Sequence, residues 1–138
     1  MALKRDPADT SFSNFIRERD NYTCQKCGKF YPEGRRQGLH CSHIFSRRHQ
    51  SVRFHSTNAK ALCFSCHQWY GSNPVESAAW VEDYLGSETL EALTKKKNEI
   101  CKRTKSEKKE IAAHWRAQLK YLKRCREEGV EFHVMEWD

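Results

Sequence analysis

Two Cys-x-x-Cys pairs carry the clearest chemical signal in this sequence. One pair is Cys24–Cys27 and the other is Cys63–Cys66, with 35 residues between them. A gap of two residues lets both thiolates of a pair turn inward on a tight knuckle, and two knuckles complete a tetrahedral zinc site. Gly28 directly follows the first pair, where such a knuckle often requires a positive φ. The spacing therefore predicts a structural Zn²⁺ site with the ligands Cys24, Cys27, Cys63 and Cys66.

Two other uses of these cysteines fit the sequence less well. A redox-active dithiol needs only one Cys-x-x-Cys pair, in a thioredoxin-like βαβ context. A disulfide framework conflicts with the odd total of seven cysteines and with the lack of a secretion signal. Outside the pairs, Cys101 and Cys125 lie in helical patterns, where we expect them to pack and not to react.

Histidines are concentrated between the two cysteine pairs. Five of the seven lie within residues 40–67, namely His40, His43, His49, His55 and His67. His67 directly follows Cys66, so zinc binding would hold its backbone in place. Asn58 lies nine residues before His67 and fifteen residues after His43. This cluster of titratable and amide side chains marks residues 40–67 as the candidate site for chemistry.

Positive charge is concentrated in two blocks of the chain. The formal charge is +7, from 25 Lys and Arg against 18 Asp and Glu. Residues 26–60 carry a net charge of +7 and residues 95–126 a net charge of +10, whereas residues 76–94 carry −5. This pattern suggests two basic surfaces that bind one polyanion such as DNA. Alternatively, the basic residues lie on solvated helix faces. In the first block we expect Arg47, Arg48 and Arg53 to contact phosphate, unless they belong to a solvated loop.

Length and hydropathy limit the class of protein. The chain has 138 residues, a mass of 16.3 kDa and a mean hydropathy of −0.92, which is typical of one domain in water. No stretch approaches the roughly 20 apolar residues of a membrane span. Met1–Asp6 is followed by no apolar run. We therefore expect neither a membrane protein nor a secreted precursor.

Hydrophobic periodicity and capping residues predict the elements that position these side chains. The expected elements are a helix over 10–20, a polar hairpin over 30–38, a strand over 39–45, a basic loop over 47–57, helices over 59–71, 75–85 and 88–97, and an edge strand over 130–134. Between Ser106 and Gly129 the periodicity predicts the longest helix. Its apolar stripe is Ile111, Trp115, Leu119, Leu122 and Cys125. The stripe is a candidate homodimer face, although packing within the chain is the commoner use.

Three stretches resemble the motifs of the HNH endonucleases, and more narrowly those of the phage and prophage zinc-ribbon members. They are Arg19–Gly28, Cys41–His49 and Asn58–His67, in which His43, Asn58 and His67 alternate with the cysteine pairs. The specific similarity covers about residues 12–72, and the remainder is similar only as a helical, phage-type extension. The resemblance implies an α+β fold with a small zinc-ribbon, ββα-metal (HNH) core over 1–75 and a helical C-terminal extension over 76–138 packed on the core.

The resemblance also implies roles for the three motif residues. His43 would be the general base, His67 would bind a catalytic Mg²⁺ or Mn²⁺, and Asn58 would orient the site. These roles agree with phosphodiester hydrolysis, which needs an activated water and a cation that stabilises the transition state. Many family members carry an acidic residue or a histidine just before the first motif histidine, but this chain has Ser42 there. The second metal ligand is therefore left open between His40, Ser42 and His49.

Taken together, the motifs lead to the expectation of a metal-dependent HNH DNA endonuclease that nicks DNA or cuts both strands. The resemblance further implies the cytoplasm of a bacterial host and phage packaging or recombination proteins as partners. The alternative is a non-catalytic zinc-ribbon module that binds DNA. Such a module needs its arginines but tolerates His43→Ala, whereas a nuclease does not.

Overall fold

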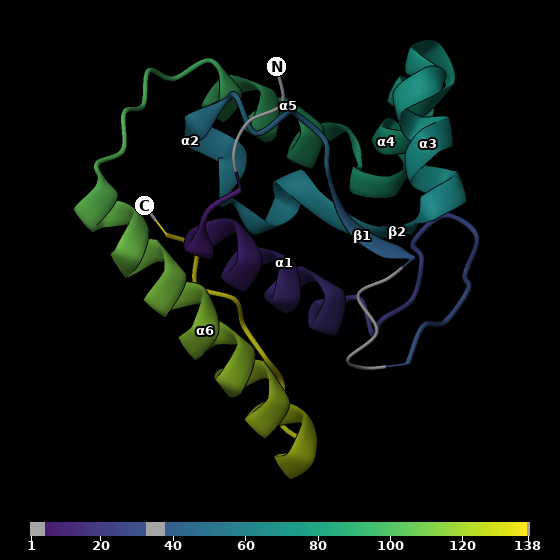
Figure 1. The fold of residues 1–138 in the computed structure, drawn as a ribbon. Helices are drawn as coiled ribbons and strands as arrows, with labels where there is room; N and C mark the ends of the chain where they lie inside the picture. Colours follow the sequence, from purple (N-terminus) through teal and green to yellow (C-terminus); the bar gives the residue numbers. More distant parts are fainter. Residues whose placement is uncertain (1–4, 33–37, 138) are drawn as a thin grey trace.

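The computed structural model describes residues 5–32 and 38–137 and shows a mixed α+β domain that is mostly helical (Figure 1). Its elements are α1 (Pro7–Arg19), β1 (Leu39–His43), α2 (Gln50–Arg53), the 3₁₀ helix η1 (Ser56–Asn58), β2 (Ala59–Cys63), α3 (Phe64–Ser72), α4 (Pro74–Leu85), α5 (Ser87–Lys97) and α6 (Lys105–Glu128). Within the described ranges, no helix has both the length and the apolar character needed to cross a membrane.

The two strands form a short antiparallel sheet that is covered on both faces. Leu39 pairs with Cys63 at one end of the ladder and His43 pairs with Ala59 at the other. Successive side chains alternate between the faces. Cys41 and His43 point toward α1, where the His43 ring lies 5.9 Å from that of Phe12. The opposite face packs against α3 and α4, where Lys60 lies over the rings of Tyr70 and Trp80.

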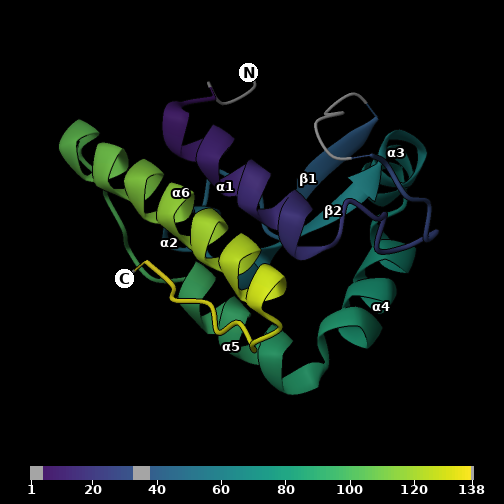
Figure 2. The same cartoon turned by 90° about the horizontal axis from the view of Figure 1, so that it is seen from below.

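Helices α1 and α6 enclose the larger hydrophobic core (Figure 2). Phe12 and Phe15 of α1 lie 5.1 and 4.8 Å from the ring of Trp115, which is fully buried. The apolar stripe expected on the last helix is used here: Ile111, Trp115, Leu122 and Cys125 are all buried within the chain. Leu119 is partly buried against the same core, so packing within the chain uses this stripe.

The C-terminal segment after α6 returns along that helix instead of forming the expected edge strand over 130–134. Phe132 packs with its ring 6.0 Å from Phe15, and the Glu136 carboxylate accepts hydrogen bonds from the backbone N–H and the hydroxyl of Ser56. The alternation of apolar residues in this segment therefore reflects anchoring on α6 and α1, since the segment pairs with no strand of the described chain.

Three other expectations about local structure are corrected by the fold. Helix α1 begins at Pro7, because Asp6 and Asp9 form a reciprocal capping box, and not near residue 10. Ala59–Cys63 is a strand and not the start of a helix; all five of its residues are buried, so the sequence has no alternation there. The basic loop over 47–57 contains α2 and the start of η1. The hairpin expected over 30–38 lies partly outside the described residues.

Lys60 is a buried lysine that the sequence analysis did not single out. Its side chain is fully buried on the α3–α4 face, with Nζ 3.3 Å from Ser42 Oγ and 3.9 Å from the centre of the Tyr70 ring. Burial lowers the pKa of Lys60 from 10.5 to about 7. The unfolded chain therefore binds a proton at this site between pH 7 and 10.5 that the folded chain does not hold, so this group makes stability rise with pH in that window.

We predict that Lys60→Met removes this pH dependence. The stability of the variant relative to the wild type should be greater at pH 7 than at pH 10 by roughly 3 kcal/mol, because the variant has no amine to desolvate. Urea unfolding of the two zinc-loaded proteins at both pH values measures the difference. A variant that loses as much stability as the wild type between pH 10 and pH 7 would show that Lys60 stays protonated in the fold.

Candidate functional site

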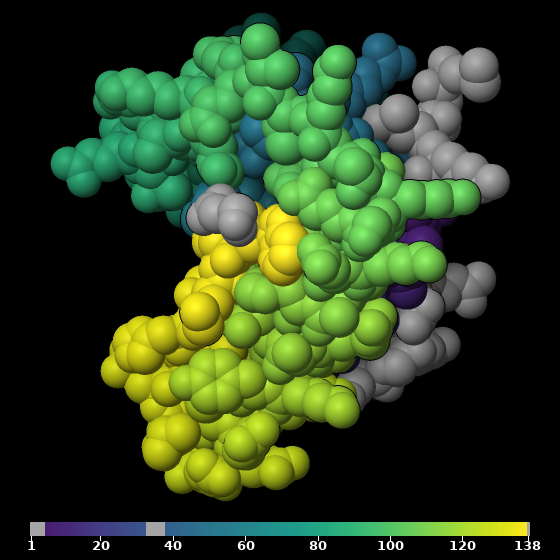
Figure 3. Space-filling view, turned by 90° about the vertical axis from the view of Figure 1, so that its left-hand side faces the viewer, coloured from purple at the N-terminus to yellow at the C-terminus, as the bar shows by residue number. Residues whose placement is uncertain are grey.

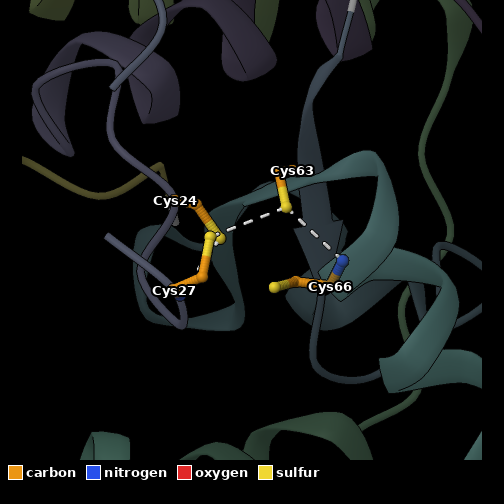
Figure 4. A group of neighbouring side chains, drawn as sticks. All are labelled: Cys24, Cys27, Cys63 and Cys66. Carbon is orange, nitrogen blue, oxygen red and sulfur yellow. Dashed lines mark hydrogen bonds between the residues drawn. The ribbon is translucent and has the colours of Figure 1, made fainter. Parts of the chain in front are cut away.

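The four cysteines of the two pairs converge on one point between the loop after α1 and the junction of β2 with α3 (Figure 4). Their four sulfurs lie within 4.8 Å of one another, and Cys27 Sγ is 3.8 Å from Cys63 Sγ. Four thiolates around one tetrahedral zinc ion at about 2.3 Å would lie about 3.8 Å apart. The donor set and its spacing fit a structural metal such as zinc.

The backbone around the cluster has the local geometry that a metal knuckle needs. Gly28 has a φ of +79° and donates its N–H to the Cys24 carbonyl at 2.9 Å. The N–H groups of Cys27 and Cys66 point at the sulfurs of Cys24 and Cys63, each at 3.5 Å. Burial alone would raise the pKa of Cys24, but backbone hydrogen bonds, that of Cys27 first, outweigh it and lower the pKa to about 7. The fold thus favours a thiolate at Cys24, the form that binds metal.

A second candidate site is an open cavity of about 570 Å³ beside β1. Side chains from α1, from β1, from the loop that follows β1 and from α3 line it. Three of the five clustered histidines face this cavity, His40, His43 and His67. Arg5, Arg17 and Arg47 line it as well, so that its wall is both basic and rich in imidazole. This cavity is distinct from the four-cysteine cluster, although His67 connects the two through its neighbour Cys66.

His40 and His67 form a close pair across the cavity wall. Their Nδ1 atoms are 2.8 Å apart, and their rings meet edge to face. Burial lowers the pKa of both histidines, so both are neutral at pH 7, the state in which imidazole binds metal. Two nitrogens bound side by side to one ion at about 2.1 Å would be about 3.0 Å apart. The observed 2.8 Å is the distance of a hydrogen bond between the two rings, and it is also close to the spacing of two ligands of one metal ion.

The other residues considered as a second ligand lie elsewhere. Ser42 is buried, accepts a hydrogen bond from Lys60 and does not line the cavity. His49 lies in the loop after β1, with its ring 6.4 Å from that of Phe45, and does not line the cavity. Of the three, His40 is the one that the structure brings to His67.

His43 has the protonation state that a base requires. Its Nε2 lies 3.2 Å from the Arg53 carbonyl oxygen, which can only accept a hydrogen bond. Nε2 therefore carries the proton, and Nδ1 keeps its lone pair. Burial lowers the pKa of His43 to about 4, so the ring is neutral across the physiological range. A general base usually has a pKa near the working pH, and the burial of this ring under α1 explains the lower value.

Asn58 joins the end of η1 to the loop that follows His43. Its side chain is fully buried; Oδ1 accepts from the Phe45 N–H at 2.8 Å, and Nδ2 donates to the Phe45 carbonyl at 2.9 Å. The Asn58 carbonyl also accepts from the Ile44 N–H at 2.7 Å. These three bonds hold the chain immediately after His43, which is the geometry of a positioning residue.

The three arginines expected to contact phosphate occupy different environments. Arg53 is buried, and its guanidinium makes two hydrogen bonds to the Asp9 carboxylate, at 3.0 and 2.6 Å, so this geometry gives it a structural place. Arg47 lines the cavity with Nη1 3.5 Å from the same carboxylate. Arg48 is exposed. The structure thus keeps Arg47 and Arg48 accessible and removes Arg53 from the surface.

Sequence reasoning missed two basic residues of the cavity, Arg5 and Arg17. Together with Asp9 and Ser13 they recur every four residues, which places them along one side of α1 and of the turn leading into it. Arg5 donates to the Ser13 hydroxyl at 2.7 Å. The four-residue spacing of polar side chains was the available signal, but only the packing of α1 beside β1 shows which surface they line.

Fold and sites define a small, mostly helical α+β protein with a four-cysteine candidate metal site. Residues 5–127 match the family model described as the bacteriophage lambda NinG protein, and the chain belongs to this NinG family. No curated protein matches the chain, and no solved structure matches it.

This finding corrects the family inferred from the motifs. The match covers nearly the whole chain and assigns it to the NinG family, not to an HNH endonuclease family, so the HNH assignment is wrong. The histidines and cysteines that suggested it are nonetheless brought together in space. What they do must therefore be argued from their geometry and not from that family.

Proposed function

We propose that this protein hydrolyses phosphodiester bonds in DNA with the help of a divalent ion bound at the cavity beside β1. The observation that carries the proposal is the composition of that cavity. It combines a neutral histidine with a free Nδ1 lone pair, a pair of imidazoles spaced for one ion, and several arginines. These are the groups that phosphodiester hydrolysis requires.

Each group of the cavity has a role that follows from its chemistry. His43 Nδ1 takes the proton from the attacking water, while the Arg53 carbonyl holds the ring by its Nε2–H. Arg5, Arg17 and Arg47 supply positive charge where the phosphate would lie. Asn58 keeps the His43 segment in position through its bonds to Phe45.

His40 and His67 are the proposed ligands of the ion, which when bound stabilises charge on the phosphate and lowers the pKa of water. The ion of this proposal is Mg²⁺ or Mn²⁺. Mg²⁺ prefers oxygen ligands, whereas nitrogen ligands favour the transition metals. We therefore expect higher activity with Mn²⁺ than with Mg²⁺.

A single substitution at the imidazole pair tests the proposal. His40→Ala should raise the Mn²⁺ concentration needed for half-maximal DNA cleavage by at least tenfold, because it removes one of two protein ligands. We choose His40 because His67 follows a cysteine of the zinc site. His49→Ala is the matched control and should leave the metal requirement unchanged, since His49 lies outside the cavity. An unchanged requirement in His40→Ala, or a changed one in His49→Ala, would contradict the assigned ligands.

A further inference from the structure

A row of basic side chains runs along the outer side of α6. Its members are Lys105, Lys109, Arg116, Lys120 and Arg124, all of them exposed. Successive members are four, seven, four and four residues apart, which places them along one side of the helix. The exposed Ala113 occupies the vacant place between Lys109 and Arg116, so the row has no bulky neutral side chain in its middle. Figure 3 shows that α6 forms a large part of one outer face of the molecule.

The row meets little opposing charge within the described part of the chain: Glu127, three residues after Arg124, lies on the same side of α6 at its C-terminal end. None of the row's five members forms an ion pair within the described residues, whereas the neighbouring Lys108 and Arg126 bind Asp6 and Glu18 of the α1 region. Glu107 is paired with Arg103. Glu110 follows Lys109 directly, so its side chain leaves the helix about 100° away from that of Lys109 around the helix axis. The fold therefore directs some basic residues of α6 inward to α1 and leaves a separate set facing solvent.

The opposite side of α6 limits which polyanion the row can meet. Ile111, Trp115 and Leu122 are buried against α1, so this helix has no apolar face to insert into a lipid surface. From Lys105 to Arg124 the helix is about 29 Å long. Phosphates repeat every 3.4 Å of axis along each strand of duplex DNA, so the row can follow a backbone for roughly eight base pairs. A straight, regularly charged face of this length fits a duplex.

The row is separate from the cavity beside β1. Figure 2 shows α1 between α6 and β1, and Arg5 and Arg17 on the α1 side line the cavity. The cavity has room for a reacting phosphate and its neighbours, whereas the row lies beyond α1 along a different helix. Of the first cationic block of the sequence, Arg47 lines the cavity, whereas the five members of the row all belong to the second block.

We propose that the basic row of α6 binds the phosphate backbone of the duplex whose scissile phosphate enters the cavity. The entry of a scissile phosphate into the cavity rests on the proposed function. The binding of the duplex by the row does not. The row positions the duplex without reading its sequence, because phosphate contacts carry no base information. It takes no part in the chemical step.

The test compares two triple variants in which three basic residues become glutamine. The row variant is Lys109→Gln/Arg116→Gln/Lys120→Gln, and the control with the same net charge is Lys29→Gln/Lys95→Gln/Lys102→Gln, three exposed residues outside the row and outside the cysteine pairs. Binding of a fluorescent 20-base-pair duplex is measured by anisotropy on zinc-loaded protein, from 50 to 200 mM salt and without added divalent ion. The row variant should bind at least tenfold more weakly at 100 mM salt, with a salt dependence reduced by about 2–3 in log–log slope. The control should change affinity less than threefold.

A second measurement separates this inference from the proposed function. Hydrolysis of bis(p-nitrophenyl) phosphate with Mn²⁺ should be the same in the row variant and the wild type, because this small diester reaches the cavity alone. If no protein hydrolyses it, the proposed function fails while the binding comparison still decides the role of the row. Equal duplex binding by the two triple variants would overturn the inference. Phosphatidylserine vesicles that bind as tightly as the duplex, with the same loss in the row variant, would also overturn it.

Discussion

Replacing His43 with alanine is expected to lower the rate of DNA cleavage by about 10²–10⁴-fold, the usual contribution of a general base. The substitution removes the one histidine of the cavity whose proton is held by a carbonyl and whose second nitrogen keeps its lone pair. Initial rates at saturating Mn²⁺ measure the effect. His133→Ala is the control, because that side chain is exposed and does not line the cavity, and it should retain full activity.

The pH dependence of the wild-type rate gives a second readout of the same residue. A base must be unprotonated, and the pKa of His43 is lowered to about 4 by burial. Its contribution is therefore complete above about pH 5 and is lost as the pH falls through 4. We expect no loss of rate through His43 between pH 8 and pH 6, where a histidine with an ordinary pKa of about 6.5 would begin to protonate. A decrease through pH 6.5 that is absent from His43→Ala would contradict the buried geometry.

Loss of one zinc ligand is expected to unfold the part of the chain that the knuckles hold. Structural zinc sites contribute about 10–16 kcal/mol of apparent binding free energy, which exceeds the stability of most small domains. Cys27→Ser should therefore release zinc and abolish the cooperative thermal transition seen by circular dichroism. A strong chelator should do the same to the wild type under reducing conditions.

The control for this experiment is another free cysteine. Cys101 lies between α5 and α6, outside the four-cysteine cluster, so Cys101→Ser should keep one zinc per chain and a melting temperature within a few degrees of the wild type. Zinc content by elemental analysis accompanies each melt. A cooperative thermal transition that survives treatment of the wild type with the chelator would refute the structural zinc site. It would favour a redox-active role for the cysteine pairs.

The four-cysteine cluster could be predicted from the sequence because its geometry is mostly local. A Cys-x-x-Cys spacing and a following glycine determine each knuckle, and only the meeting of the two pairs needs the fold. The long helix was predictable for a similar reason: its apolar stripe and Gly129, which ends it with a φ of +68°, are both local signals. Its N-cap is Thr104 and not Ser106, a shift of the kind expected at helix ends.

The features that sequence reasoning missed depend on contacts between distant segments. Residues 59–63 form a strand only because α1 and α3–α4 bury both faces of the sheet. Arg53 leaves the surface because Asp9, 44 residues away, binds its guanidinium. The family was misassigned because a few histidines, an asparagine and two cysteine pairs are shared too widely to identify one, whereas the NinG match extends over residues 5–127.

Cleavage of supercoiled plasmid by the zinc-loaded wild type, with Mn²⁺, with Mg²⁺ or with no added divalent ion, tests the central claim most directly. The cavity beside β1 predicts relaxed or linear plasmid when an ion is added, more with Mn²⁺ than with Mg²⁺, and intact supercoiled plasmid without it. Plasmid that stays supercoiled under all three conditions, while a gel shift shows it bound, would contradict the claim. The protein would then be a zinc-containing DNA-binding module whose histidine cavity has no catalytic role.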